Sequence, residues 1–361
     1  MSTGRSSVAV RGRTIDDSVV LFVNNDIYSG WTSVEINRRL NSIATSFSVS
    51  LTDRWTIDSR PFAIARGQSF CIQIGGRPVV NGFIDSVDSE ISATTRSLSI
   101  TGRSLAGDLV DCSYIGRSQF TDNPTMSVIV NTMLEPFGIK SIFKVDGGSF
   151  TKLDIRQGEK VAEVIDRMAR EKNLIVYSDF EGNLVFDQGG SSRSTSDIIQ
   201  GQNLLSASVR RNNTDRFSEY FIKSQSSGIV GTPQNAIQNT GSATDEGVTR
   251  YRPLLLVGEN SNNQQTATQR AAYEANIRSA KSEVFNVSVQ GWFQRDGSLW
   301  DINQIVGLRS SYLDHDGDLL VDSVSFSKSV SGTITNLTLV RPDAYQFSPI
   351  VPKSFDDGIV R

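Results

Sequence analysis

Histidine and cysteine are scarce in this chain of 361 residues, which has one histidine and two cysteines. A Ser-His-Asp or Cys-His catalytic arrangement would have to use His315. The two cysteines are too few for a disulfide framework. Cys71 stands in the apolar run 70–74, so we expect Cys71 and Cys112 to be two buried, reduced thiols.

Long hydrophobic runs and an excess of one charge are also missing. No apolar stretch approaches the roughly 18 residues that a membrane helix needs, and no apolar segment of a signal peptide follows residues 1–5. We therefore expect synthesis in a reducing cytoplasm and no stable membrane insertion. The 36 basic and 39 acidic residues give a net charge of −3, which argues against sequence-specific binding of nucleic acid.

The remaining composition is that of a folded protein of several domains. Hydrophobic residues make up 38% of the chain, enough for a real core. The length allows two or three domains at roughly 100–200 residues each. The first hundred residues alternate apolar and polar side chains in short segments, which is typical of half-buried strands. These segments are 19–24, 31–37, 46–52, 70–74, 82–87 and 96–102.

The middle of the chain changes to a mixed pattern. Residues 125–134 have helical spacing, and Gly138 follows as a stop signal. A second helix is predicted from Val161, with an apolar stripe at positions i, i+3, i+4 and i+7. Two strands, 174–177 and 183–186, follow with a hairpin turn between them. We expect a small α/β domain over 107–195, with a loop over 189–196 by composition.

The last part of the chain again favours strands. Two are predicted at 207–210 and 219–223, and the polar stretch 225–248 is expected to be a long or mobile loop. A helix is predicted over 264–281. Four further strands close the pattern, at 284–289, 305–308, 318–326 and 333–340.

The candidates for a reaction centre or a metal site are weak. Aspartates alternate from Asp314 to Asp318 around His315, as at the start of a calcium loop. Gly317 then stands at the fourth position instead of the sixth, and Ser325 replaces the final glutamate. We therefore expect an Asp-Gly hairpin turn there and no bound metal. Ser104 approaches a nucleophile elbow, but the second glycine comes one place late, which favours a strand-to-helix turn.

Tryptophans and carboxylates leave two alternatives open. Trp31, Trp55, Trp292 and Trp300 could stack on sugars or bases, although Trp31 and Trp292 adjoin strand cores and are expected to pack or to contact another subunit. The 39 acidic residues include possible carboxylate pairs for glycoside cleavage, but none lies in a recognisable lytic motif. The sequence thus predicts no catalytic, cofactor-binding or metal-binding residues and no enzyme. A peptidoglycan hydrolase and a carbohydrate-binding module remain the alternatives.

An ordered set of segments resembles one protein family over nearly the whole chain. Residues 28–34 and 47–50, the helix-plus-hairpin unit 160–187, the run 268–303 and the closing 337–345 resemble the Mu-type tail baseplate hub proteins. The unit 160–187 also resembles part of the type VI secretion spike proteins. No single motif is diagnostic, and the order of the segments carries the resemblance.

This resemblance implies an architecture and a role. Mainly β structure with α+β parts is expected, with two small antiparallel β-barrel domains, a small α/β domain and an insertion. The implied divisions are 1–106 for the first barrel, 107–195, then 196–225 with 282–345 for the second barrel, 226–281 for an insertion with loop and helix, and 346–361 for a tail. Three chains would form a pseudo-sixfold ring that joins the hexameric tail tube to the trimeric central spike, beside neighbouring wedge proteins. The implied location is the tail baseplate of a contractile virion, and no cofactor is implied.

Overall fold

The computed structural model describes residues 7–345, except 11–12, 25, 41, 53–63, 93–95, 226–237, 258–263 and 331. The chain is mainly β with α+β parts, has several sheets and is multi-domain, as predicted. It divides into two compact units. Unit 1 comprises 1–209 with 285–339, and unit 2 comprises 210–284 with 340–361.

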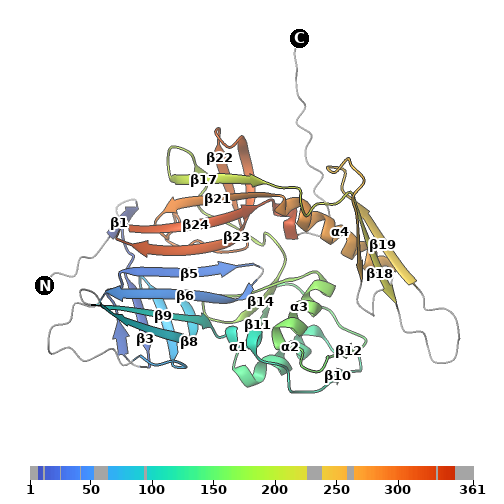
Figure 1. Cartoon of the computed structure of the whole chain (residues 1–361), viewed down its shortest axis with the longest axis horizontal. Coiled ribbons are helices and arrows are strands. Elements are labelled where there is room, and N and C mark those ends of the chain that lie inside the picture. Colours follow the sequence, from blue (N-terminus) through green and yellow to red (C-terminus); the bar gives the residue numbers. More distant parts are fainter. Residues whose placement is uncertain are drawn as a thin grey trace, which may run out of the picture. The chain divides into compact units, whose positions relative to one another are not determined.

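One large sheet forms the frame of unit 1, and Figure 1 shows its central strands side by side. The order of the strands is β17 (Leu204–Arg211), β21 (Glu283–Gln290), β24 (Gly332–Val340), β23 (His315–Ser329), β5 (Ser33–Arg39), β6 (Ser42–Thr52), β9 (Arg96–Ser104), β8 (Arg77–Ile91), β7 (Ser69–Ile74), β3 (Val19–Val23) and β4 (Asp26–Tyr28). Strand β22 (Gln304–Ser310) pairs with β23 and with two short strands, β15 (Ser192–Arg193) and β16 (Ile198–Ile199). A separate hairpin pairs β1 (Ser7–Val10) with β2 (Arg13–Asp16).

The alternating sequence explains these strands. In β6, Phe47 and Val49 are buried while the serines between them face outward. A turn at Gly75-Gly76 joins β7 to β8, and both glycines have positive φ, which glycine adopts without a steric penalty. Each strand predicted in the first hundred residues overlaps an observed strand.

The two predicted barrel domains are called the first β region (1–106) and the second β region (196–225 with 282–345). They meet along one seam, where β5 pairs antiparallel with β23. Its register runs from Val34 opposite Lys328 to Arg39 opposite Ser323. The seam joins residues near the start of the chain to residues near its end in one continuous sheet. Among the described residues the pairs run in one open order from β17 to β4, so closure of each region into its own barrel stays a prediction.

The α/β part has its own core. Helix α2 (Met126–Leu134) begins at Thr125, whose side chain accepts a hydrogen bond from the N–H of Val128. Helix α3 (Val161–Lys172) buries the predicted stripe, and Asn173 ends it in the left-handed conformation. A three-stranded sheet of β11 (Ser141–Phe143), β14 (Leu184–Asp187) and β13 (Ile175–Ser178) completes this core. The remaining short elements are α1 (Gly107–Asp111), β10 (Gln119–Phe120), the 3-10 turn η1 (Glu135–Phe137) and β12 (Leu153–Asp154).

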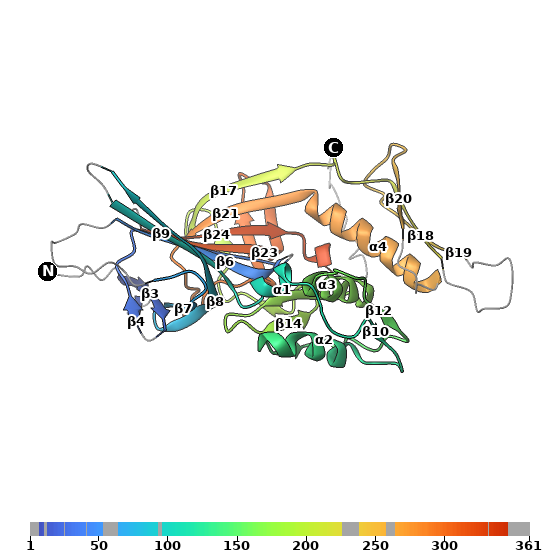
Figure 2. The same cartoon turned by 60° about the horizontal axis from the view of Figure 1, so that its bottom comes forward.

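Unit 2 consists of a small sheet and one long helix, which Figure 2 shows together. Strand β18 (Glu219–Gln225) lies between β19 (Gln238–Thr244) and β20 (Pro253–Val257), and α4 (Gln264–Lys281) packs on the sheet. The core joins Tyr220 and Ile222 to a row of alanines on α4, which are Ala267, Ala271 and Ala275. The 3-10 turn η2 (Pro342–Tyr345) also belongs to this unit.

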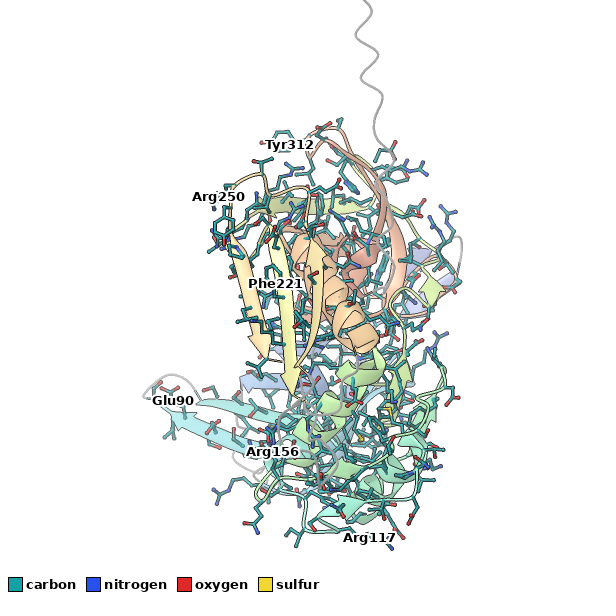
Figure 3. All side chains as sticks on the ribbon, turned by 90° about the vertical axis from the view of Figure 1, so that its right-hand side faces the viewer. Glu90, Arg117, Arg156, Phe221, Arg250 and Tyr312 are labelled. Carbon is teal, nitrogen blue, oxygen red and sulfur yellow. The ribbon has the colours of Figure 1, made fainter. Side chains whose placement is uncertain are left out.

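The other face of this sheet carries apolar side chains from two strands. Phe221 of β18, labelled in Figure 3, lies opposite Leu255 of β20. Leu255 is 56% exposed, and Val257 further along β20 is 88% exposed.

Two expectations about loops and one about a strand need correction. The predicted loop 225–248 is wrong for 238–244, which form β19, while 226–237 lie outside the described residues. The polar composition of 238–244 indicated a loop, although the backbone of these residues pairs with β18. The loop 189–196 contains β15, because Ser192 and Arg193 pair with β22. Strand β18, assigned from the sequence to the second β domain, pairs instead with β19 and β20.

Candidate functional site: a hydroxyl-lined sheet face and the junction behind it

Small polar side chains cover one face of the large sheet. This hydroxyl face is defined by polar residues at outward positions of seven neighbouring strands, and other outward positions of the same strands carry Arg39, Arg103 and Ile334. The polar residues are Asn286 and Ser288 of β21, Asn336 and Thr338 of β24, Ser323, Ser325 and Ser327 of β23, Ser33, Glu35 and Asn37 of β5, Ser46, Ser48 and Ser50 of β6, Ser97, Ser99 and Thr101 of β9, and Ser86, Asp88 and Glu90 of β8.

The strand register brings these positions into rows. Ser327 lies opposite Glu35, Glu35 opposite Ser48, Ser48 opposite Thr101, and Thr101 opposite Ser86. Because side chains alternate along each strand, the positions between them point the other way and are mostly apolar, as with Val34, Phe47 and Ile100. Glu90, labelled in Figure 3, lies near the end of β8.

Hydrogen bonds link neighbours on this face. The Ser288 hydroxyl donates to the Asn336 side-chain oxygen at 2.6 Å, and the hydroxyls of Ser86 and Thr101 are 2.9 Å apart. A shallow hollow of about 520 Å³ lies over β17, β21, β24, β23 and β5, and most of its lining is serine, asparagine and threonine. The sheet therefore presents a continuous polar surface that both β regions share.

Behind this face, Arg38 of β5 holds three parts of unit 1 together. Its side chain is 1% exposed and forms an ion pair with Asp301. Its guanidinium also donates to the Ser178 carbonyl at 2.7 Å and lies 3.9 Å from the ring centre of Phe180. Arg38 thus connects the first β region, the α/β hairpin and the second β region.

A second buried network surrounds Asp187 at the end of β14. Its carboxylate accepts hydrogen bonds from the Lys144 ammonium, the Tyr177 hydroxyl and the Asn303 amide, each at 3.0 Å. The Ser191 hydroxyl donates to it at 2.6 Å. Burial alone would raise the pKa of Asp187, but the hydrogen bond from Ser191 and the contact with Lys144 hold that pKa below its usual value.

The sequence candidates for chemistry lie apart from one another and serve structural roles. His315 begins β23, and its ring centre lies 4.7 Å from that of Phe285. The expected Asp-Gly turn is wrong in position, because the turn occupies 311–314 and Gly317 lies in the strand. Asp318 receives two hydrogen bonds from Arg193. Within the described part of the chain, no group of three or more His, Cys, Asp or Glu side chains could hold a metal.

The remaining candidates are mostly buried. Ser104 ends β9, is 4% exposed, and its hydroxyl accepts from the N–H of Thr45. Trp31 and Trp292 pack in the core as predicted, Trp300 is also buried, and Trp55 lies outside the described residues.

The two thiols differ in their surroundings. Cys71 is half-buried, and burial raises the pKa of its thiol. Cys112 is exposed, so the expectation of two buried thiols is wrong for Cys112. The physical reason is its position directly after α1, where its N–H bonds to the Asp108 carbonyl and its side chain lies outside the core.

Sequence reasoning missed both the hydroxyl face and the Arg38 junction. A signal for the face is present, because serine recurs at every second position in 46–50 and 323–327. No comparable signal marks Arg38, since it stands beside Arg39 and only the fold buries one of the two. No helix among the described residues is long and apolar enough to cross a membrane.

Family models and known proteins match this arrangement. Residues 18–104 match the N-terminal domain of Mu phage baseplate assembly protein GpP-like proteins, 106–188 match the second domain of baseplate hub protein gp44-like proteins, and 263–348 match the fourth domain of GpP. The three matches follow one another in chain order.

Similar whole chains include one curated protein and two solved structures. The 43 kDa tail protein of prophage MuSo2 from Shewanella oneidensis is 31% identical, with a TM-score of 0.83 over 91% of this chain and 99% of that chain. The E. coli c3393 protein, a type VI secretion component, shares the fold at 9% identity, with a TM-score of 0.57 over 92% of this chain and 80% of that chain. The baseplate hub protein gp44 of Escherichia phage Mu is 30% identical over 86% of this chain and 84% of its own length. The chain therefore belongs to the family of the Mu baseplate hub protein gp44.

Proposed function

We propose that this chain is the structural hub of a contractile phage tail and acts as a homotrimer. Three copies form a pseudo-sixfold ring that joins the hexameric tail tube to the trimeric central spike, with wedge proteins around it. The chain is made in the bacterial cytoplasm and resides in the tail baseplate of the virion. The family membership supports this role.

The observation that carries the proposal is the shared sheet. Two β regions from opposite ends of the chain join through β5 and β23, so each copy contributes two β regions to one continuous surface. Three copies would offer six such regions, which fits a sixfold partner on one side and a threefold partner on the other. Closed rotational symmetry also limits the assembly to a ring.

The non-enzymatic role is part of the same proposal. The carboxylates behind the sheet are engaged in hydrogen bonds within their own clusters. Asp187 accepts from the Tyr177 hydroxyl, and Asp301 accepts from the N–H of Ile302. The carbohydrate-binding alternative needs an exposed tryptophan, and the three tryptophans among the described residues, Trp31, Trp292 and Trp300, are buried.

Light scattering on the purified chain tests the assembly. A mass three times the 39.6 kDa of one chain is expected, alone or after addition of the spike protein. A strictly monomeric species at high concentration, with and without spike, would overturn the ring. Zymography on peptidoglycan is expected to show no lysis, whereas lysis that one carboxylate substitution abolishes would favour the hydrolase.

A further inference from the structure

Strand β20 lies at one edge of the three-stranded sheet of unit 2, and Figure 3 shows that sheet around the labelled Phe221 of its central strand, β18. The Arg252 carbonyl accepts a hydrogen bond from the N–H of Ser218, so the main chain of Arg252 faces β18. Because alternate residues of a strand direct their N–H and C=O groups to the same edge, those of Leu255 and Val257 point away from β18. Among the described residues, no strand pairs with that edge.

The proline of β20 fits this orientation. Pro253 is the first residue of the strand and has the same outward orientation as Leu255 and Val257, so its missing N–H costs no bond to β18. A proline at an edge blocks the addition of another strand at its own position. Leu255 and Val257 come after it, and each carries both an N–H and a C=O group on the open edge. Most of this edge can therefore pair with a further strand.

Apolar side chains cover both faces of this edge strand. On the face away from α4, Leu255 lies opposite Phe221 and is 56% exposed, and Val257 is 88% exposed. On the other face, α4 packs mainly on β19 and β18, and Leu254 and Leu256 remain partly exposed. An exposed apolar edge strand of this kind attracts another strand, because the added chain gains backbone hydrogen bonds and side-chain contacts together.

The opposite edge strand, β19, lacks these properties. On the face away from α4 it carries Thr240, Ser242 and Thr244, so this side of β19 is polar. On its other face, α4 approaches so closely that a Cβ atom on Gly241 would lie 2.1 Å from the helix backbone. Strand addition is therefore favoured at β20.

The charges around β20 describe the segment that fits this edge. Lys223 is exposed opposite Val257, near the end of the strand, and has no ion pair within the described part of the chain. The start of β20 is mixed in charge, because Glu219 lies opposite Pro253 and Arg250, labelled in Figure 3, precedes the strand. The end near Lys223 therefore favours a carboxylate on the partner.

We propose that β20 binds an extended segment of another protein as a fourth strand of this sheet. The segment runs antiparallel to β20, because antiparallel pairs are the more stable. Apolar residues recur at every second position of the segment and pack beside Leu255 and Val257, and a carboxylate lies where the segment passes Lys223. The inference concerns unit 2 alone and holds whether or not the chain forms the proposed ring.

Peptide binding to the full chain tests the added strand. The probe is a fluorescent peptide of alternating valine and threonine with one glutamate at its N-terminal end, and anisotropy measures its dissociation constant. Two further peptides carry N-methyl groups, on the valines in one and on the threonines in the other. A strand offers only one of these sets to β20, so one methylated peptide is expected to bind like the probe and the other at least roughly tenfold more weakly. Equal binding of both, or no saturable binding of the probe, would overturn the proposal.

Two proline variants locate the edge. Val257→Pro removes an outward N–H and is expected to weaken binding of the probe about tenfold. Thr240→Pro is the matched control on β19, because the Asp245 N–H bonds to the Ser218 carbonyl and the N–H of Thr240 therefore faces away from β18. Binding is expected to be unchanged in this control, and the reverse pattern would place the added strand on β19. The methylated peptides give the same answer on the unaltered chain if a proline variant does not fold.

A charge exchange tests the carboxylate. Lys223→Glu is expected to weaken binding of the probe about fivefold and to strengthen binding of a peptide with lysine in place of the glutamate by a similar factor. Unchanged affinities of both peptides would contradict a partner with a carboxylate at this end.

The chain's own C-terminal residues and a second copy are the other candidates for the occupant. A chain that ends at Tyr345 is expected to bind the probe with unchanged affinity. Binding that is about tenfold tighter would show that residues 346–361 compete for the edge, and an affinity that falls as protein concentration rises would show that a second copy does. Either result would contradict an outside partner.

Discussion

Arg38 is a charged residue on the buried side of a strand, and its partners explain how that position is tolerated. Neighbouring inward positions are apolar, as with Val34 and Ile36. A guanidinium there is costly unless a carboxylate and further acceptors satisfy it. Asp301 and the Ser178 carbonyl supply both to the two terminal nitrogens, from segments far apart in the chain, while the Nε atom has no hydrogen-bond partner among the described residues. The pair fixes which segments meet at this point.

Removing the carboxylate should expose that cost. Asp301→Asn leaves the Arg38 guanidinium buried without its counter-charge, so we expect a loss of about 3 kcal/mol in the free energy of unfolding. Chemical denaturation followed by fluorescence measures it. Asp316→Asn is the control, because Asp316 is 83% exposed and its contact with Arg309 is weak. Equal effects of the two substitutions would contradict the role of the junction.

Asp187 predicts a dependence of stability on pH. Its pKa is lowered in the folded chain, so its contribution is fully present above the unfolded value of about 4 and is lost as pH falls through the folded pKa. We expect Asp187→Asn to destabilise the chain at pH 7 and to cost progressively less below about pH 4. Urea unfolding of both proteins at pH 7, 5 and 3 gives the difference. A difference that stays constant with pH would contradict this account.

For single residues, the sequence predicted which side chains are buried better than it predicted which side chains bond to each other. Alternation placed Phe47 and Val49 inward, since a strand has only two faces. The partners of Arg38 and Asp187 depend on which segments the fold brings together. Cys112 shows the same limit, because a cysteine one residue beyond a short helix is exposed by geometry that its own type does not encode.

Among the elements, α4 and β19 approach each other most closely where both carry small residues. A Cβ atom on Gly241 would lie 2.1 Å from the carbonyl carbon of Ala267 and 2.2 Å from the N atom of Thr268. Those contacts are with backbone, which cannot move away as a side chain can. The alanines of α4 and the glycine of β19 therefore set the distance between helix and sheet.

Gly241→Ala is expected to lower the stability of unit 2 and to leave the core of unit 1 unchanged. A cost of about 1–3 kcal/mol is typical of overpacking at a close contact. Hydrogen exchange should show faster exchange in β18, β19 and α4, because those elements share this core. Gly317→Ala is the control, since its new Cβ would meet His315 at an ordinary distance of 3.6 Å. Unchanged exchange in the Gly241 variant would refute the close-packing argument.

The elements in which apolar residues recur at regular spacing were predicted well, and the elements made mainly of polar residues were not. The helix predicted over 264–281 is confirmed as Gln264–Lys281, because its alanines mark a consistent buried face. Strand β19 was missed, since its sequence Gln-Asn-Thr-Gly-Ser-Ala-Thr has no valine, isoleucine or aromatic residue, and its two threonines stand among residues typical of loops. Its pairing with β18 supplies the stability that its own side chains do not.

For the whole molecule, association and folding are expected to be linked. If only the trimer brings the outer strands of the large sheet against other copies, the trimer stabilises the folded chain. The apparent melting temperature should then rise with protein concentration, by about 1 kcal/mol of stability per chain for each tenfold increase. Calorimetry over a hundredfold range of concentration measures this. A melting temperature independent of concentration would contradict the linkage.

The seam between β5 and β23 has a consequence for how the chain is made. The two strands that it joins lie near opposite ends of the sequence, and the ion pair behind it spans 263 residues. During translation, β5 is synthesised early, whereas its partner β23 is synthesised close to the end of the chain. Until then the edge of β5 is an unpaired template for other nascent chains. A truncated product that ends before His315 should therefore accumulate as aggregates, which makes complete synthesis a condition of solubility.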